Sequence, residues 1–335
     1  MEDSRAPGHE ILKEPIQMER PRTLGFVVIE KPTPVYRKDN RDSKWKTLGD
    51  FLSPPVFDAY GQIDPLATSL KAGNVVAILA KIRGGIFKIQ IPGLEGVYYI
   101  DRRFIDESKI TPVKPPEKEP HCPPRATIFQ RLHDALGKLY VWGGTSAGGF
   151  PEILKFYPST PPLSEEDERK KIGAGYDCSG LLHDATDGFT PRNSTQIAKC
   201  GQAVDIENLS VSQIIDKVEP LDTIVWTGKD AGHVMIILDK KRVIESKLIF
   251  HKNEYGEIVV EKSVVCVRSL QEVLKEIMGV TPEETVGQGA STTPDAAPKK
   301  SQKKRKPVNS INPKNQDREF VIRRWYSETN DPPKG

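Results

Sequence analysis

The run Tyr176-Asp177-Cys178-Ser179-Gly180 predicts the start of a short helix that reaches about residue 186. Asp177 is a residue type that commonly caps helix N-termini, and the apolar residues after the run fall on one side of the helix. A thiol in the first helical turn lies near unpaired backbone N–H groups and the positive end of the helix dipole, which favour its thiolate form. We therefore predict that Cys178 is a nucleophile.

The alternative interpretation is that Cys178 is a small buried apolar residue, which is the usual state of a cysteine. That interpretation stands for the other three cysteines, which are Cys122, Cys200 and Cys266. The four lie far apart without a Cys-x-x-Cys pair, and this pattern is not that of a small disulfide-stapled domain. A reducing compartment fits this usage, and we predict neither a bound metal nor a cofactor.

A cysteine nucleophile needs a general base, and histidine is a common partner. Four of the six histidines lie in a tail, in a linker, on a helix face or on the far side of the cysteine helix: His9, His121, His133 and His183. His233 begins the apolar strand 233–238 after an Ala-Gly pair and is better placed than His251. We predict that His233 is the base, against the alternative of a histidine that only closes a strand end.

An imidazole base needs an acceptor at its second nitrogen, which fixes the tautomer and stabilises the imidazolium. A hairpin centred on Asp239 places Glu245 directly opposite His233 on the same face, and Ser246 on the other face. We therefore predict that Glu245 orients His233. The alternative is an ordinary solvated strand carboxylate, because a register slip of one residue turns a side chain to the opposite face.

The first part of the chain has the pattern of an all-β domain. Runs of β-branched and aromatic residues, separated by Gly and Pro, predict short strands at 26–29, 75–79, 86–91 and 97–100. Several short strands must close or stack to hide their edges, so a small β-barrel is expected over residues 24–113.

The second part begins after the proline-rich, charged spacer 114–124. Apolar residues spaced by three and four predict a helix at 126–139 that opens a second domain, residues 125–278. A β-rich region at 223–268 and a helix at 270–278 complete that domain. The 335 residues therefore suit two domains.

The remaining segments differ from the domains in composition. Residues 1–23 form a polar tail, and 279–317 holds almost no large apolar residue, so we predict that this insertion is disordered. Residues 318–327 have the composition of a strand that returns to the sheet, and 328–335 form a second tail.

The formal net charge is +3, and six Lys and Arg residues within 299–306 contribute +6, so the other residues together carry −3. We therefore expect no specific nucleic-acid partner, and the basic cluster is either a solvating linker or a contact for acidic polymers or membrane phosphates. Neither an ordinary secretory signal nor a membrane-spanning stretch is seen. We predict a cytoplasmic protein, which reaches the periplasm or cell wall only by unconventional export.

Five motifs in order resemble the NlpC/P60 family of cell-wall cysteine peptidases. They are Tyr140-Val141-Trp142-Gly143-Gly144, Asp177-Cys178-Ser179-Gly180-Leu181, Pro191-Arg192-Asn193-Ser194 with Gln196 and Gly201, Glu219 to Trp226, and Gly232 to Leu238. They cover about residues 126–246, and 320–325 resembles the family's closing strand. The resemblance implies an α+β fold, in which a papain-like NlpC/P60 catalytic domain follows a small β-barrel similar to a bacterial SH3 domain.

The resemblance also implies roles. Cys178 attacks the amide carbonyl and its N–H donates to the oxyanion, His233 transfers the proton, and Glu245 takes the place of the third, orienting residue. The subgroup with an N-terminal SH3 domain cleaves γ-D-glutamyl-diamino-acid bonds, so the implied partner is a peptidoglycan stem peptide or muropeptide. The residues implied to bind it are Tyr98, Tyr99, Tyr140, Trp142, Asp177, Ser179, Arg192, Asn193 and Ser194.

Three departures from the family pattern bear on this expectation. The third residue is most often His, Asn or Gln rather than a glutamate such as Glu245. Asn193 replaces an Asp that helps to hold the free amine of L-Ala in the subgroup, which puts that specificity in question. The insertion 150–174, charged at 165–171, is placed to reshape or cap the cleft.

Two other classes remain open. One is an amidase of the related CHAP type, which cuts between the lactyl group and L-Ala; acyltransferases on this fold usually have their His before the Cys. The other is a wall-binding protein with an inactive site. Iodoacetamide separates these classes, because a stabilised thiolate at Cys178 should be alkylated first, at a pH well below 8.5.

Overall fold

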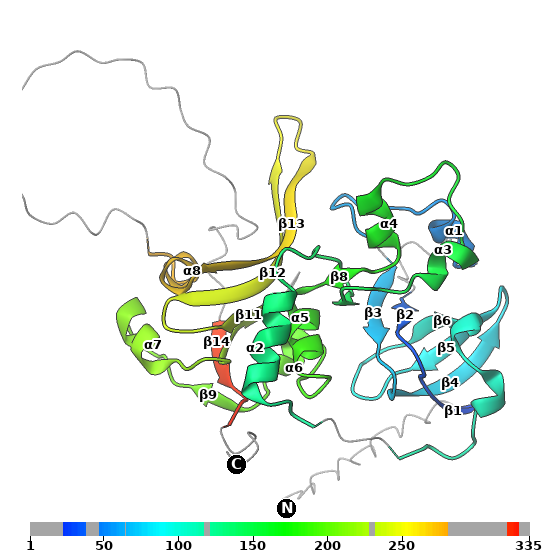
Figure 1. Ribbon diagram of the computed structural model, residues 1–335, viewed down its shortest axis with the longest axis horizontal. Helices are drawn as coiled ribbons and strands as arrows, with labels where there is room; N and C mark the ends of the chain where they lie inside the picture. The colour runs from blue at the N-terminus through cyan, green and yellow to red at the C-terminus, as the bar shows by residue number, and fades with distance from the viewer. Residues whose placement is uncertain are drawn as a thin grey trace, which may run out of the picture.

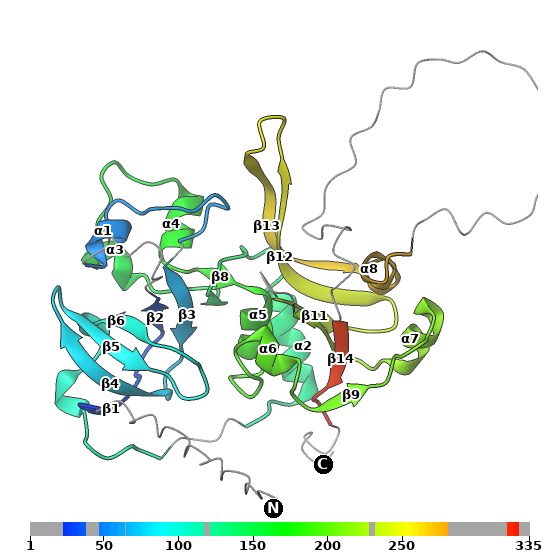
Figure 2. The ribbon, with the colours of Figure 1, turned by 180° about the vertical axis from the view of Figure 1, so that it is seen from behind.

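The computed structural model describes residues 23–37, 47–63, 65–116, 121–227, 232–280 and 320–327 (Figure 1). Helices and antiparallel strands are mixed in it, with two six-stranded sheets and one two-stranded sheet. The tail 1–22, nearly all of the insertion predicted at 279–317, the basic cluster and the tail after residue 327 lie outside the described residues. The two larger sheets lie side by side in both views (Figures 1 and 2).

The first sheet has the strand order β1-β4-β5-β6-β2-β3. Its strands are β1 (Gly25–Val28), β2 (Thr33–Tyr36), β3 (Leu66–Leu70), β4 (Val75–Ile82), β5 (Ile86–Gln90) and β6 (Tyr98–Asp101). The four strands predicted in this region form within a few residues of their expected bounds. Within the described residues no pairing joins the edge strands β1 and β3, so no closed barrel is found, and the likeness to an SH3 domain stays a prediction.

Short helices lie beside the first sheet: α1 (Gly49–Leu52), η1 (Arg102–Phe104), η2 (Glu107–Lys109), α3 (Glu152–Phe156) and α4 (Glu165–Lys171). The last two belong to the insertion, whose Phe150 and Ile153 are buried in the same hydrophobic core as the first sheet. Gly173, with φ +65°, has no side chain because a Cβ there would clash with the Phe150 ring. We call residues 23–116 together with 150–172 the first lobe.

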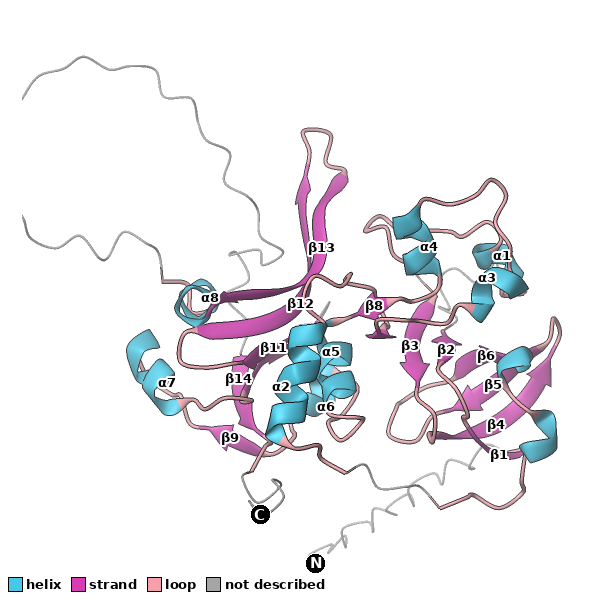
Figure 3. Ribbon diagram, in the orientation of Figure 1, coloured by secondary structure: helices cyan, strands magenta, loops and turns pink. Residues whose placement is uncertain are grey.

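The second sheet has the order β13-β12-β11-β10-β14-β9 and forms the second lobe together with the helices packed on it (Figure 3). Its strands are β9 (Gln202–Val204), β10 (Thr223–Thr227), β11 (Gly232–Ile237), β12 (Arg242–Lys252), β13 (Ile258–Ser269) and β14 (Phe320–Arg324). The segment near the C-terminus for which the sequence predicts a strand thus lies between β10 and β9.

The two faces of the second sheet are covered by different helices. These are α2 (Arg125–Asp134), α5 (Cys178–Ala185), α6 (Ser194–Ile197), α7 (Val211–Lys217) and α8 (Leu270–Ile277). Side chains alternate along β11, so that Val234 and Ile236 pack with α2 and α5, whereas Met235 and Ile237 pack with α7 and α8. This alternation explains why the four residues from Val234 to Ile237 are all apolar.

Helix α2 ends earlier than its apolar spacing predicts, at Asp134 instead of residue 139. Gly137 adopts a left-handed conformation with φ +74°, and its N–H donates to Val265 O on β13 at 3.0 Å. The chain therefore leaves the helix to join the edge of the sheet. The helical spacing of apolar residues in the sequence extends to Leu139 only because Leu139 packs in the core of the first lobe.

The turn Trp142-Gly143-Gly144 fixes the second lobe against the first. Trp142 N–H donates to Gln62 Oε1 at 3.0 Å, and Gly143 has φ +76°. A Cβ at Gly143 would lie 3.1 Å from the backbone of β3, and one at Gly144 would lie 2.5 Å from Gly175 O. Only glycine therefore fits where β3, this turn and the two-stranded sheet of β7 (Thr145–Ser146) and β8 (Gly175–Tyr176) meet.

The long hairpin β12–β13 projects from the second lobe beside the first lobe (Figures 1 and 2). Near its tip the Phe250 ring meets Tyr60, with 5.0 Å between ring centroids. Within the described residues, no helix is long and apolar enough to cross a membrane.

Candidate active site

Cys178 is the first residue of α5, as the sequence predicts, and is half-buried against the core of the second lobe. Asp177 is the N-cap, and its Oδ1 accepts a hydrogen bond from Gly180 N–H at 2.6 Å. In the described part of the chain no acceptor is found for the Cys178 N–H. This N–H is therefore available to a negatively charged oxygen bound beside the thiol.

Asp177 also accepts hydrogen bonds from residues outside helix α5. Its carboxylate, 8% exposed, also accepts hydrogen bonds from Gly143 N–H at 3.0 Å, from Ser179 Oγ at 3.1 Å and from both ends of the Arg192 guanidinium. Arg192 in turn donates to Ser179 Oγ at 2.8 Å. Three residues predicted to bind substrate therefore hold one another and fix α5 to the Trp-Gly-Gly turn.

His233 lies at the start of β11 with its side chain 15% exposed. Its Nε2 lies 2.7 Å from Glu245 Oε2, and the Cys178 thiol lies near enough to raise the pKa of the ring. The Trp226 ring on β10 covers it, with 4.9 Å between ring centroids. Since Nε2 faces the glutamate, Nδ1 is the nitrogen left for the thiol. The structure therefore brings the three predicted catalytic residues into one chain of contacts.

The His233 to Glu245 contact arises from a different register than the one predicted. β11 and β12 pair Ile236 with Ile244 and Ile237 with Val243, a shift of two residues from a hairpin centred on Asp239. The prediction of a directly opposite pair is therefore wrong. A shift of two keeps every side chain on its face of the sheet, so Glu245 reaches His233 diagonally, whereas Ser246 turns away and donates to Tyr176 O.

Glu245 is 2% exposed and is surrounded by cations. Lys247 Nζ and Arg268 Nη1 each lie 3.3 Å from its Oε1, and Arg268 also pairs with Glu276. Burial alone would raise the pKa of Glu245, but the hydrogen bond from His233 and the charges of His233, Lys247 and Arg268 lower it to about 2. Glu245 is therefore a carboxylate throughout the neutral range.

The same contacts act on His233 in the opposite direction. Burial lowers the pKa of this imidazole, but its hydrogen bonds to Cys178 and Glu245 outweigh burial and raise it to about 10. The ring is therefore held in its protonated form between the thiol and the carboxylate. This arrangement can supply a proton to a leaving group.

The other predicted binding residues lie at different distances from the thiol. Tyr140 is buried beside the Cys178 thiol. Burial raises the Tyr140 pKa well above its usual range, and the nearby charges of Cys178 and Asp177 raise it further. Trp142 is 38% exposed, and its ring centroid lies 5.9 Å from the Arg37 guanidinium. Ser194 Oγ lies against Gly232, next to His233, whereas Asn193 is the exposed residue before α6.

Tyr98 and Tyr99 lie on β6 of the first lobe and pack against its core. Tyr98 donates its hydroxyl proton to Glu95 O at 2.9 Å, and burial raises its pKa, an effect that the nearby Arg37 charge opposes. Through Arg37, Tyr98 is linked to Trp142 at the border of the second lobe. Tyr99 pairs with Lys88 and Tyr36 within the first sheet.

Three histidines that the sequence analysis did not choose as the base lie in other surroundings. His183 Nδ1 lies 2.7 Å from Thr190 O, and burial lowers its pKa to about 4. His251 pairs with Glu261 at 2.9 Å, and His133 has a side chain that is 77% exposed. Among the described residues no group of three or more His, Cys, Asp or Glu side chains is placed to hold a metal ion.

A scan of protein-family models finds no match, and neither does a search of curated protein sequences. Several solved structures are similar. The peptidoglycan hydrolase RipB from Mycobacterium tuberculosis matches 43% of this chain and 67% of its own at 21% identity, with a TM-score of 0.25.

Two further structures extend that comparison. RipD from the same organism, a non-catalytic NlpC/p60 domain protein, matches 42% of this chain and 93% of its own at 19% identity and a TM-score of 0.25. NlpC2 from Trichomonas vaginalis matches 73% of this chain and 67% of its own at 16% identity, with a TM-score of 0.24. Because these TM-scores are low, a function can be inferred only from the geometry of the site.

Sequence reasoning missed three residues of the site: Trp226, Lys247 and Arg268. Trp226 pairs with His233 across β10 and β11, and the short connection between these strands is a signal that could have found it. Lys247 is two residues beyond Glu245 on the same strand face. Arg268 comes from β13, and nothing local to Glu245 in the sequence points to it.

Proposed function

We propose that the protein is a cysteine hydrolase that cleaves a peptide bond in peptidoglycan stem peptides or muropeptides. The observation that carries this proposal is that the Cys178 thiol lies beside the His233 ring, which is hydrogen-bonded in turn to Glu245 Oε2. A nucleophile, a base and an orienting acceptor in this order are the parts that acyl transfer by a cysteine requires.

The reaction begins from a Cys178 thiolate beside a His233 imidazolium. The thiolate attacks the scissile carbonyl carbon, and the oxygen that gains negative charge accepts a hydrogen bond from the Cys178 N–H. The imidazolium gives its proton to the amine as the C–N bond breaks, which leaves a thioester on Cys178. Water then gives a proton to His233 while it attacks the thioester, and release of the acid restores the thiolate and imidazolium.

Glu245 orients the ring and takes no proton in this scheme. With a pKa of about 2, held there by His233, Lys247 and Arg268, it stays ionised while His233 gains and loses its proton. Its hydrogen bond to Nε2 keeps Nδ1 directed at the thiol and stabilises the imidazolium. A glutamate therefore suits the position that other side chains usually occupy in the family.

The substrate assignment rests on the five motifs that resemble NlpC/P60 peptidases. Within that class the bond between D-γ-glutamate and diaminopimelate is the one we propose. Tyr140 and Trp142 are proposed to line the cleft, because the first lies beside Cys178 and the second is exposed where the two lobes meet.

The test compares the wild-type chain with Cys178→Ala on L-Ala-γ-D-Glu-diaminopimelate and on the tetrapeptide ending in D-Ala, read by mass spectrometry. We expect L-Ala-D-Glu from the wild type and none from Cys178→Ala. Cys200→Ala is the matched control and should keep wild-type activity, because Cys200 lies beside Arg323 and burial raises the pKa of its thiol.

Two other results would replace the proposal. Release of the whole stem peptide from a muropeptide would assign the bond between the lactyl group and L-Ala, as in CHAP amidases. Binding of muropeptide without any cleavage by the wild type would indicate a wall-binding protein.

A further inference from the structure

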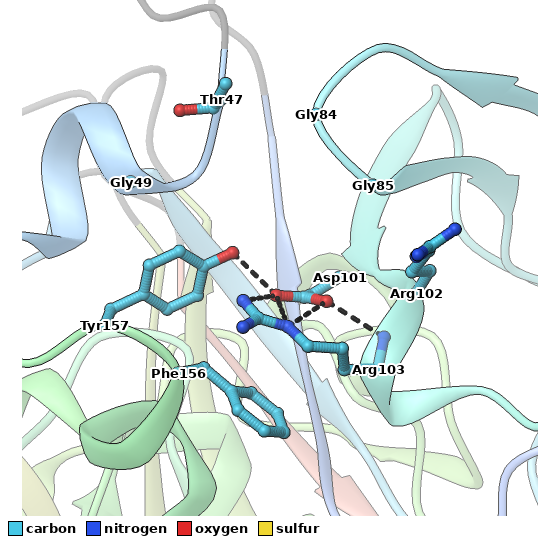
Figure 4. Close-up of a pocket in the computed structure, with 9 residues that line it drawn as sticks. All are labelled: Thr47, Gly49, Gly84, Gly85, Asp101, Arg102, Arg103, Phe156 and Tyr157. Carbon is cyan, nitrogen blue, oxygen red and sulfur yellow. Dashed lines mark hydrogen bonds and ion pairs between the residues drawn. The ribbon is translucent and has the colours of Figure 1, made fainter.

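A pocket lies in the first lobe, and none of its lining residues belongs to the candidate active site. It has a volume of about 600 Å³ and is formed where the β4–β5 turn, η1, the start of α1 and the end of α3 meet (Figure 4). That volume is within the range of pockets that bind small molecules, roughly 300–1,000 Å³. The pocket is therefore large enough for a short peptide or a comparable ligand.

The floor of the pocket is a carboxylate with no acceptor capacity left. Asp101, 2% exposed, accepts hydrogen bonds from Arg103 N–H at 2.9 Å, from Arg103 Nε and Nη2, and from the Tyr157 hydroxyl at 2.6 Å. The Arg103 guanidinium also packs on the Phe156 and Tyr157 rings, at 4.1 and 4.8 Å from their centroids. Two carboxylate oxygens have about four lone-pair sites, so Asp101 cannot also bind a ligand's ammonium group.

The charge that remains for a ligand is that of Arg102. Its side chain is 63% exposed, and its one ion pair within the described residues is with Glu107 at 4.0 Å. Glu107 has a closer partner in Lys81, at 2.5 Å. Because Asp101 and Arg103 neutralise each other, Arg102 leaves the lining with one positive charge in excess.

The rim beside Arg102 is open because two successive residues have no side chain. Gly84 and Gly85 have φ of +88° and +72°, a conformation that glycine adopts without strain. A Cβ at Gly85 would lie 3.5 to 3.7 Å from Arg102 Nε, Cδ and Cγ, so this backbone borders the guanidinium directly. Figure 4 shows the Arg102 side chain beside Gly85 at the edge of the pocket. A ligand that contacts the backbone of this turn would therefore also lie close to the Arg102 charge.

We propose that this pocket binds a carboxylate group through Arg102. Guanidinium and carboxylate match in geometry as well as charge, and a two-point contact is favoured over a single hydrogen bond. The carboxylate can come from a wall peptide or from a free small acid. The pocket is separate from Cys178, so this binding does not depend on the proposed peptidase activity.

The test uses the full chain carrying Cys178→Ala, so that no probe is cleaved, and isothermal titration calorimetry. The probes are N-acetyl-L-Ala-γ-D-Glu-diaminopimelate, the same peptide with every carboxylate amidated, and N-acetyl-D-glutamate. We expect Arg102→Ala to weaken the Arg102-dependent binding roughly tenfold or more. Arg102→Lys should retain part of the affinity, because it keeps the charge without the two-point geometry.

Two further variants locate the binding. Gly49→Leu fills the pocket from α1, since a Cβ at Gly49 lies 3.8 Å from the Tyr157 ring, and it should abolish the same binding event. Arg169→Ala removes an arginine that is 54% exposed outside the pocket and should have no effect.

The two carboxylate sources give different results. Arg102-dependent binding of the tripeptide assigns the wall peptide, and Arg102-dependent binding of N-acetyl-D-glutamate alone assigns a free acid. The proposal is overturned if the amidated peptide binds equally well, or if Arg102→Ala and Gly49→Leu leave all binding unchanged. Neither of these results affects Cys178-dependent cleavage, so the two proposals fail separately.

Discussion

Each lobe contains a carboxylate that is 2% exposed, Asp101 in the first and Glu245 in the second. Asp101 is held by Arg103, whose charge is permanent, and by the Tyr157 hydroxyl. Glu245 is held by Lys247, Arg268 and a histidine that also contacts a thiol. Burial and ion pairing are therefore common to both, and the difference is that only Glu245 is paired with a group that gives up and regains a proton in the proposed reaction.

The largest expected effect tests whether the Cys178 site in the second lobe is catalytic. Cys178→Ala and His233→Ala should each lower the rate of peptide cleavage by at least about 10³-fold, because nucleophile and base act as a unit. Iodoacetamide labelling followed by peptide mass mapping gives a second measurement. His233→Ala should slow the alkylation of Cys178, whereas labelling of Cys200 stays unchanged. Equal labelling rates of Cys178 in the wild type and in His233→Ala would contradict the pairing of the thiol with the imidazole.

The two carboxylates should respond differently to the same chemical change. Glu245→Gln leaves Lys247 without its anion and Arg268 with Glu276 alone, and we expect it to destabilise the fold by about 3–5 kcal/mol and to lower the rate roughly 10²- to 10⁴-fold. Asp101→Asn should lower stability by about 1–3 kcal/mol and leave the rate unchanged. Urea unfolding and the mass-spectrometric assay measure the two effects. A large rate loss in Asp101→Asn would remove the distinction between the sites.

Arg268 should have a smaller effect that acts through Glu245. Arg268→Gln removes one of the cations that lower the Glu245 pKa, so that pKa should rise. We expect kcat to fall roughly tenfold and the acid limb of the pH–rate profile to move to higher pH. Arg268→Lys should restore most of this loss, and Arg242→Gln on the exposed part of β12 should change neither quantity. A loss of kcat with an unmoved acid limb would make Arg268 purely structural.

The pH dependence of stability should show the signs of both shifts. The Glu245 pKa of about 2 lies below its ordinary 4.5, so its contribution is present above pH 4.5 and is lost as the pH falls toward 2. The His233 pKa of about 10 lies above its ordinary 6.5, so its contribution is complete below pH 6.5 and is lost as the pH rises through 10. For this pair the stabilisation is therefore greatest between pH 4.5 and 6.5.

Urea midpoints from pH 3 to 10 measure this dependence. Glu245→Gln should remove the acid limb and reduce the alkaline limb, because only the interaction with Cys178 then raises the His233 pKa. Asp101→Asn should keep both limbs, since it leaves the second lobe untouched. Identical profiles for the wild type and Glu245→Gln would mean that the pair does not control stability.

The best sequence predictions were those that depend on neighbouring residues. The start of α5 at Cys178 with Asp177 as N-cap follows from bonds within one turn of the chain. The contact between His233 and Glu245 was predicted with the wrong register, and the period of two along a strand kept the pair on one face. The end of α2 was misplaced because a periodic apolar pattern does not distinguish a helix from a chain that turns at Gly137 and packs elsewhere.

The sequence by itself determined the local chemistry of this protein: a cysteine at a helix start, a histidine at a strand start and a carboxylate on the face that meets it. Only the tertiary structure decided that Arg268 and Lys247 keep Glu245 ionised, that Trp226 covers His233, and that the insertion packs on the first lobe beside Asp101. The physical reason is the distance along the chain over which each interaction acts. Capping and alternation act over a few residues, whereas burial and ion pairing depend on which strands and lobes meet.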